Sequence, residues 1–498
     1  MGPVADTIHR IRRRLLLEVL DLDPVPEPQP PKAEWPEWST GGDSSPVRLR
    51  VLSLNAWGLP VAPKCTERAV EIANAIHDKY EIVVLQEIWH RRERDIIINR
   101  VAEKGFHYYH YFQPAVGFPV PFGPNSFGTG LLVLSKYPLL GAMYHSFSLT
   151  GRPYALHEAD FIANKGVGLL RVQTPHDQVD LYVTHLLANY NHLGQPGPGD
   201  RYLAHRVSQS YELERFIEAT SRNAFTLVCG DFNSPSDCMV LRIPRELRQL
   251  RDAFTDMNNH DGLTFAAEDN KFSHGEHPMR MDYILYKIAR CNQEKQRSNS
   301  AEPAPGWHLV ASDVFKAFFT DEKGDKYPLS DHFGVTAEFV FAAKTPLDPC
   351  DASGDEPSGA DCATTTCIQC DTVKLDNENA SDQIDAAGHT VITRCLDDLQ
   401  ATLHEGRLVA MDRRVAHLRR SAQTLFVLLV LMTIHLSLID LSQWVWVVAL
   451  LLLVHVVVEY TLAFFVVGLE VSTFTELVSE VRLHQQTEAV LAQHAAAL

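Results

Sequence analysis

Short apolar runs alternate with polar segments along the first two thirds of the chain, and they predict more strands than helices. Gly, Pro, Asn or Asp bounds most of these runs, which is typical of buried strands. Within 47–342, helical periodicity is strongest at 66–79 and 202–220. Strands are predicted at 48–54, 81–85, 130–135, 168–173, 179–184, 225–229, 281–286 and 334–341. Because successive strands lack helical crossovers, the pattern predicts an α+β fold with two sheets packed face to face and helices outside.

Two much longer apolar segments follow, at 422–439 and 444–469. Each approaches the roughly 20 residues that a helix needs to cross a bilayer, and each is apolar on every face. The few residues that join them predict an antiparallel transmembrane hairpin. The positive-inside rule then places the globular part and both chain ends in the cytosol, because the joining residues contain no Lys or Arg. The basic residues stand before the first segment and include Arg413, Arg414, Arg419 and Arg420.

The composition along the chain divides it into six parts. They are an N-terminal basic helix with a Pro-rich linker (1–46), a globular domain (47–342), an acidic Cys-containing linker (343–390), a juxtamembrane helix (391–420), the hairpin (421–470) and a C-terminal cytosolic helix (471–498). Two segments allow two interpretations each. The basic helix at 8–20 and the Pro- and Phe-rich loop at 112–125 either touch a membrane surface or pack on the domain.

Polar residues within the hairpin are costly in a bilayer unless they pair or face protein. His435, His455 and Glu459 are such residues. They predict either a His–Glu contact between the spans or a contact in a homodimer formed through the spans. The membrane in which the hairpin resides is left open among the endoplasmic reticulum, Golgi, nuclear envelope and plasma membrane.

Charge and cysteine content narrow the class of protein. The formal charge of −17 argues against a protein that binds nucleic acid through its phosphates. Nine cysteines, an odd number, do not resemble a secreted disulfide framework. Cys362, Cys367 and Cys370 either bind zinc or belong to a reduced, disordered linker, and the linker is favoured because no well-spaced fourth ligand follows.

Polar residues collect where the predicted strands end. Each of them alone also fits a turn or a strand cap, but random strand ends rarely provide three carboxylates, two amides and two imidazoles together. This inventory favours a site for phosphodiester hydrolysis assisted by a hard cation. The residues are Asn55, Glu87, His185, Asp231, Asn233, Asp331 and His332.

The residue types predict separate chemical roles. A carboxylate such as Glu87, with Asn55 nearby, suits Mg²⁺ and leaves positions open for water and substrate. The Asp331–His332 pair is a candidate general base. Asn233 and His185 could donate hydrogen bonds to the charge that builds on the phosphoryl oxygens.

These motifs together resemble the neutral sphingomyelinases, membrane-anchored members of the DNase I-like endonuclease/exonuclease/phosphatase superfamily. The resemblance covers residues 48–341 and implies a four-layer α/β/β/α sandwich. It rests on Leu54-Asn55-Ala56-Trp57-Gly58, Gln86-Glu87-Ile88-Trp89, Lys165-Gly166-Val167-Gly168, Cys229 to Asn233, Asp282-Tyr283-Ile284-Leu285-Tyr286 and Leu329 to His332.

The resemblance implies a Mg²⁺-dependent sphingomyelin phosphodiesterase of the phospholipase C type, which produces ceramide and phosphocholine from a membrane lipid. The alternatives are a related phospholipase C that acts on lyso-phosphocholine lipids, and an inactive membrane scaffold that keeps the fold. A DNA endonuclease and an inositol-phosphate phosphatase are disfavoured by the hairpin and by the lack of a basic stripe.

The resemblance also implies roles for individual residues. Glu87 would bind Mg²⁺ with help from Asn55, and Asn233 would contact the phosphate. Asp231 would orient the attacking water, and His185 would polarise the phosphoryl group.

Two further pairs of residues receive roles in the same way. His332 would be the general base, held by Asp331. Asp160 and Lys165 would shape the mouth of the active site and contact the substrate.

Overall fold

The computed structural model describes residues 26, 28, 47–76, 79–113, 128–155, 158, 160–161, 163–190, 200–288, 306–342, 379–437 and 444–497. Several sequence-based predictions concern residues outside these ranges. They are the basic helix at 8–20, most of the Pro- and Phe-rich loop, the three clustered cysteines and the residues that join the two apolar segments.

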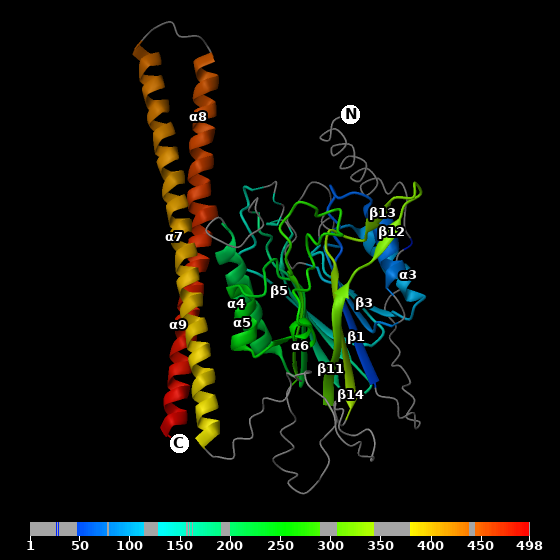
Figure 1. Cartoon of the computed structure of the whole chain (residues 1–498). Helices are drawn as coiled ribbons and strands as arrows, with labels where there is room; N and C mark the ends of the chain where they lie inside the picture. Colours follow the sequence, from blue (N-terminus) through cyan, green and yellow to red (C-terminus); the bar gives the residue numbers. More distant parts are fainter. Residues whose placement is uncertain are drawn as a thin grey trace, which may run out of the picture.

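Two six-stranded mixed sheets form the centre of the globular domain (Figure 1). The order of strands in the first sheet is β11 (Gly306–Phe315), β14 (Gly334–Ala342), β1 (Val47–Asn55), β2 (Ile82–Gln86), β4 (Leu132–Ser135) and β3 (Tyr108–Tyr111). The order in the second is β5 (Leu139–Ser146), β6 (Gly166–Gln173), β7 (Gln178–His185), β8 (Phe225–Asp231), β10 (Asp282–Ile288) and β9 (Arg251–Asp252). A separate hairpin consists of β12 (Phe318–Thr320) and β13 (Lys326–Pro328).

Each sheet has one face in the shared core and one face covered by helices. Side chains such as Val51, Leu181 and Phe339 fill the space between the sheets, and they are completely buried. The first sheet packs against α2 (Cys65–Ala75) and α3 (Arg91–Ala102), and the second against α4 (Leu203–Thr220) and α5 (Met239–Leu247); a short helix, α6 (Ala253–Met257), lies beside β10 and β11. The predicted four-layer α/β/β/α sandwich is therefore confirmed.

All eight predicted strands are present within a few residues of their expected bounds, but other elements were not predicted. Strand β5 lies at a sheet edge with most of its side chains partly or fully exposed, so it has no continuous apolar face. Helix α3 begins with Arg-Arg-Glu-Arg-Asp, and its apolar residues start only at Ile96. Both elements are held by tertiary packing rather than by a strong local pattern.

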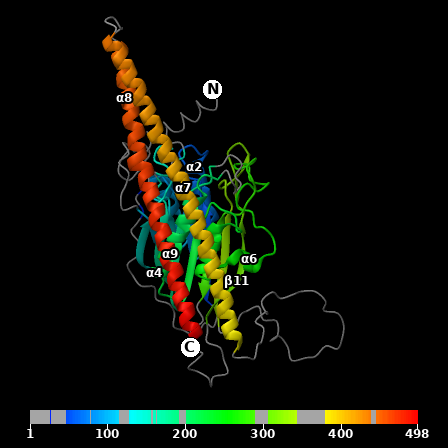
Figure 2. The same ribbon diagram turned by 90° about the vertical axis from the view of Figure 1, so that its left-hand side faces the viewer.

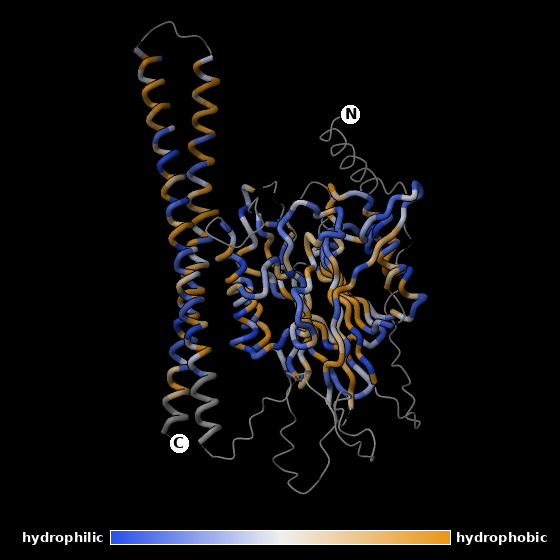
Figure 3. The backbone as a smooth tube through the Cα atoms, in the orientation of Figure 1, coloured by the Kyte–Doolittle hydropathy of each residue, from blue (hydrophilic) through white to orange (hydrophobic). Residues whose placement is uncertain are grey.

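Three long helical elements follow the domain. Helix α7 (Asn379–Ser437) is continuous across the predicted juxtamembrane helix and the first apolar segment, and α8 (Trp444–Thr461) continues through a π-helical turn (Leu462–Val466) into α9 (Val467–Ala497). By length and composition, two helices could cross a membrane: α7, and the continuous helix that α8 and α9 form together. Figure 3 shows that the apolar residues concentrate near the hairpin end, where many of them are exposed. The pair therefore suits a membrane anchor.

An ionic cluster around the buried Glu459 joins α7 to α8. Oε2 of Glu459 lies 2.7 Å from Nδ1 of His417 and 3.0 Å from Nε of Arg420. The predicted contact of Glu459 with a histidine of the spans is wrong, because its partner is His417, which precedes the apolar segment, and not His435 or His455. Glu459 is therefore buried and paired on α8, which lowers the cost of a carboxylate next to an apolar segment.

Candidate active site

Strand register brings three polar residues of the second sheet side by side. Asp231 ends β8, where it lies opposite His185 of the parallel strand β7 and Asp282 of the antiparallel strand β10. Strand β8 is buried along its whole length, so its end is held firmly in the sheet. The core packing of one strand therefore fixes the position of a carboxylate between an imidazole and a second carboxylate.

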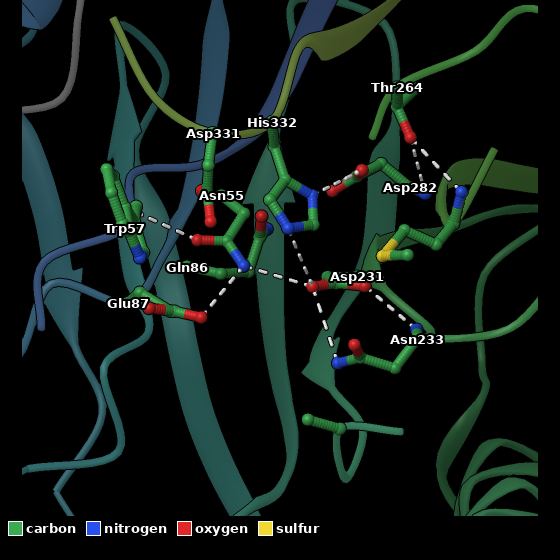
Figure 4. Close-up of polar contacts among 12 residues, drawn as sticks. Asn55, Trp57, Gln86, Glu87, Asp231, Asn233, Thr264, Asp282, Asp331 and His332 are labelled. Carbon is green, nitrogen blue, oxygen red and sulfur yellow. Dashed lines mark hydrogen bonds and ion pairs between the residues drawn. The ribbon is translucent and has the colours of Figure 1, made fainter. Parts of the chain in front are cut away.

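Asn55 connects this group to the first sheet. It ends β1 beside Gln86 of β2, and its Nδ2 atom donates to Oε1 of Glu87 at 3.1 Å and to Oδ2 of Asp231 at 3.0 Å (Figure 4). Its Oδ1 atom accepts a hydrogen bond from the backbone N–H of Trp57 at 2.9 Å. Asn55 thus holds two carboxylates from different sheets next to each other.

Left-handed backbone occurs at several of these positions. The φ angles of Trp57, Glu87 and Asn233 are 49°, 59° and 47°, a region that residues other than glycine rarely adopt. Close backbone approach explains two motif glycines. A Cβ atom on Gly58 would lie 2.0 Å from the carbonyl oxygen of Glu87, and one on Gly230 would lie 2.0 Å from the carbonyl oxygen of Thr184.

The partner of His332 differs from the prediction. Its Nδ1 atom lies 2.9 Å from Oδ2 of Asp282, and its Nε2 atom lies 4.0 Å from Oδ2 of Asp231. The predicted pairing with Asp331 is wrong, because adjacent residues direct their side chains apart: Asp331 accepts from Ser330 at 3.1 Å and lies on the Glu87 side of the imidazole (Figure 4). Asp282 was predicted only as part of a strand motif, although its position at the strand's first residue is a usable signal.

His185 has a cation as its neighbour. Nζ of Lys165 lies 2.9 Å from Nε2 of His185, 3.0 Å from Oδ1 of Asp160 and 2.7 Å from the carbonyl oxygen of Leu186. Lys165 is almost completely buried. Burial, and then the charges of Lys165 and His332, hold the pKa of His185 well below its usual value. His185 is therefore a neutral imidazole whose Nε2 atom accepts from Lys165.

Four nitrogen atoms surround one oxygen, Oδ2 of Asp231. They are Nδ2 of Asn55 at 3.0 Å, Nδ2 of Asn233 at 3.4 Å, Nε2 of His185 at 3.6 Å and Nε2 of His332 at 4.0 Å. Asn233 also donates from Nδ2 to the carbonyl oxygen of Leu186 at 2.9 Å. The structure thus brings together the predicted residues from both sheets, while their chemical roles stay predictions.

The electrostatics of the cluster favour an added positive charge. Burial raises the pKa of Asp231 and of Asp331 to about 6, and it raises that of Glu87 as well. Burial opposes protonation of His332, but the carboxylates of Asp282 and Asp231 outweigh it and hold its pKa well above the usual value. Carboxylates that lose hydration in this way are the usual ligands of a hard cation.

Two buried carboxylate oxygens of the cluster have no hydrogen-bond partner among the described residues, Oε2 of Glu87 and Oδ1 of Asp282. The orphaned oxygen of Glu87 has room for interaction with a divalent cation, and its role as a metal ligand stays a prediction. Donor atoms of Asp231, Asp282 and His332 also lie close enough together to hold a metal ion. However, the short contact between Nδ1 of His332 and Oδ2 of Asp282 already engages one donor atom of each of these two residues, so we favour the Glu87 position.

A sandwich of two mixed sheets with carboxylates, amides and imidazoles gathered at one end defines the class of DNase I-like phosphodiesterases. The chain belongs to the endonuclease/exonuclease/phosphatase family, whose model matches residues 52–332, and within it to the neutral sphingomyelinases.

The chain is similar to several named proteins. The chain is 31% identical over 324 residues to sphingomyelin phosphodiesterase 2 of Mus musculus, a match that covers 62% of this chain and 69% of the relative. It is 33% identical to inositol phosphosphingolipids phospholipase C of Schizosaccharomyces pombe, covering 40% of this chain and 43% of the relative. A beta toxin mutant from Staphylococcus aureus, solved with bound magnesium ions, aligns with a TM-score of 0.42 at 17% identity, covering 58% of this chain and 99% of the toxin.

Proposed function

We propose that this chain is a Mg²⁺-dependent neutral sphingomyelinase that hydrolyses sphingomyelin to ceramide and phosphocholine. The proposal rests on the four nitrogen atoms that surround Oδ2 of Asp231. The carboxylate of Glu87, which follows the facing sheet's strand β2, is joined to this group through Asn55. This arrangement offers the carboxylate of Asp231 and the imidazole of His332 to a water molecule, and the amide of Asn233 to a phosphoryl oxygen. The sphingomyelin phosphodiesterases among the relatives support the choice of lipid.

Glu87 would hold Mg²⁺ through its unpartnered Oε2 atom, with Asn55 fixing the orientation of that carboxylate. When bound, the ion supplies positive charge to the phosphoryl oxygens and to the leaving oxygen of ceramide. The positive φ of Glu87 and the close contact with Gly58 keep the carboxylate in place before substrate arrives. Such preorganisation avoids rearrangement during the reaction.

The proton-transfer residues are Asp231, His332 and Asp282. Asp231 orients the attacking water, and Nε2 of His332, 4.0 Å from Oδ2 of Asp231, accepts its proton. Asp282 holds the Nδ1 side of the ring and stabilises the imidazolium that forms. The same carboxylates that raise the pKa of His332 make Nε2 a stronger base.

Asn233 and His185 form the opposite side of the cluster. Asn233 has amide hydrogens directed at Asp231 and Leu186, and a phosphoryl oxygen entering between them would receive a hydrogen bond. Lys165 and Asp160 stand behind His185, where Lys165 adds positive charge close to the phosphate. With the apolar hairpin in a membrane and the domain in the cytosol, the substrate would come from the cytosolic leaflet.

The proposal is tested with the purified full-length chain in detergent micelles. We expect phosphocholine release from sphingomyelin with Mg²⁺, little release after chelation by EDTA, and loss of activity in Glu87→Gln and His332→Ala. Glu276→Gln alters an exposed carboxylate outside the cluster and should retain activity.

The same assay with other lipids identifies the substrate class. Faster headgroup release from a lyso-phosphocholine lipid or an inositol phosphosphingolipid would reassign the substrate while keeping the phospholipase C chemistry. If the folded Glu87→Gln and His332→Ala variants show the same phosphocholine release as the unaltered chain, this site does not catalyse the reaction. The chain is then a scaffold, and the proposed enzyme activity is wrong.

A further inference from the structure

The C-terminal helices lie against the globular domain as a fifth layer, outside α4 and α5 (Figures 1 and 2). Apolar side chains of α7 and α9 are completely buried in one core cluster with those of the second sheet's helices. The contributing residues are Leu396, Leu399 and Leu403 of α7, Phe474 of α9, and Val207, Tyr211 and Leu213 of α4. The helix pair is thus docked on the domain and does not merely follow it through a linker.

Gly406 marks the closest approach in this interface. A Cβ atom at this position would lie 2.5 Å from the Cβ of Ala204 and 3.0 Å from the ring of Phe474. Glycine within a helix is unfavourable by about 1 kcal/mol relative to alanine, so its presence in α7 needs a packing reason. The contact with Ala204 at the start of α4 provides that reason.

Ionic contacts reinforce the docking. Nε2 of His205 on α4 lies 3.3 Å from Oε1 of Glu470 on α9, and Arg413 of α7 forms an ion pair with the same carboxylate. Arg413 also donates from Nη1 to the hydroxyl of Tyr154 at 3.1 Å. The side chains of His205, Arg413 and Glu470 are mostly buried. Their contacts fix the orientation of the helices in an interface that apolar packing holds together.

The contacts along α7 show which way the apolar hairpin projects. Asp398 of α7 lies 2.9 Å from Arg242 of α5, then Gly406 meets the start of α4, and then Arg413 meets Tyr154. The start of α4 lies at the site end of the domain, because Nε of Arg206 donates to Oγ of Ser234 at 3.1 Å, three residues after Asp231. Helix α7 therefore runs toward the catalytic end and continues beyond it.

The apolar segment begins just past that end. Nine residues separate Arg413 from position 422, which at 1.5 Å per residue is about 14 Å of helix. The following side chains are apolar and exposed, among them Leu425, Phe426, Val427 and Leu429. Val61, in the loop after β1, and Tyr154 are also exposed at this end, by 44% and 38%.

We propose that the interface of α7 and α9 with α4 is a positioning surface that holds the catalytic end of the domain against the bilayer in which the hairpin is anchored. The catalytic end of the domain, where Val61 and Tyr154 are exposed, contacts the lipid surface. The cluster around Asp231 would then face lipid headgroups at a fixed height. The inference rests on the proposed function for the identity of the substrate, but not for the docking geometry.

The first test measures orientation without using activity. A fluorescent amino acid replaces Val61 in the full-length chain, which is placed in nanodiscs whose lipids carry spin-labelled headgroups. We expect quenching in the otherwise unaltered chain and loss of quenching in Gly406→Leu, because the added side chain cannot fit against Ala204. Ala401→Leu adds a similar bulk on the exposed face of α7 and should preserve quenching. Absent quenching, or equal quenching in Gly406→Leu, would overturn the inference.

The second test compares two substrates in the same nanodiscs. Gly406→Leu should lower hydrolysis of bilayer sphingomyelin by about tenfold, because a loosely tethered domain loses effective concentration and orientation at the surface. Hydrolysis of soluble bis(p-nitrophenyl) phosphate should be unchanged. Gly406→Ala should show a smaller defect, which Ala204→Gly should relieve by removing the nearest atom. Equal loss on both substrates would make the interface a folding element only.

These results separate the two proposals. If the unaltered chain is quenched at position 61 but releases no phosphocholine from any lipid, the proposed function fails and the docking stands. If phosphocholine is released normally by Gly406→Leu, the docking inference fails and the function stands.

Discussion

Nδ1 of His332 lies 2.9 Å from Oδ2 of Asp282, a residue fifty positions earlier in the chain. Asp331, which is adjacent in sequence, instead accepts a hydrogen bond from Ser330. The two aspartates therefore flank the imidazole on different sides. Asp282 belongs to the proton-transfer side of the cluster, and Asp331 lies toward Glu87, the proposed Mg²⁺ ligand.

Asp282→Asn should lower kcat by about 10²–10⁴-fold, since an imidazole without its orienting carboxylate has the wrong tautomer and less stabilisation of its charged form. The measurement is phosphocholine release at saturating Mg²⁺. Asp331→Asn provides the comparison, and there we expect the main change in the Mg²⁺ concentration that gives half-maximal rate. The assignment is contradicted if the two variants exchange these effects.

The titration of His332 can be measured directly. In the metal-free protein, burial is outweighed by the charges of Asp282 and Asp231, so the pKa of His332 should lie well above 6.5. Asp282→Asn should move that pKa down, because one of the opposing charges is removed. Histidine ring proton shifts followed by NMR against pH would report the change, with His332→Gln to assign the signal.

The pKa shift of His332 also has a consequence for stability. A histidine whose folded pKa is raised stabilises the folded state below its unfolded pKa, and this contribution disappears as the pH rises through the folded value. The metal-free protein should therefore lose part of its free energy of unfolding as the pH rises above 6.5. A slope that is identical in the Asp282→Asn variant would show that the pair does not contribute.

Gly230 is required by the approach of two strands. Its Cβ position lies 2.0 Å from the backbone oxygen of Thr184, and neither strand can move without disturbing the core. Gly230→Ala should lower the free energy of unfolding by about 1–3 kcal/mol and reduce activity, because Asp231 is the next residue. Gly141→Ala, in the edge strand β5 with open space around it, is the matched control. Equal melting temperatures for the two variants would contradict this explanation.

The sequence was sufficient for those parts of the site that depend on strand ends. Apolar runs before Asn55, Glu87, His185 and Asp231 predict where buried strands stop, and parallel neighbours end at the same edge of a sheet. These side chains were therefore expected to meet, and they do.

The pairing of His332 with Asp282 could not be predicted in this way. It depends on the antiparallel register that places Asp282 opposite Asp231, and on the bridge that pairs His332, in the loop before β14, with Phe265. Likewise, Gly406 has no local signature beyond an unfavourable residue in a helix, because its partner Ala204 lies about two hundred positions away. Contacts between distant elements follow from the assembled fold.

The cluster of Glu459, His417 and Arg420 gives a final prediction about the anchor. Replacing Glu459 with Leu leaves two basic side chains of α7 without their acceptor, and it should weaken the pairing of α7 with α8 by about 1–3 kcal/mol. We expect a lower melting temperature in detergent and faster proteolysis of the hairpin. Glu405→Leu, on an exposed part of α7, is the matched control. If Glu459→Leu instead raises the melting temperature, apolar packing of the two helices holds the hairpin together and the ionic cluster serves another purpose, such as fixing the depth of α8 relative to the docked domain.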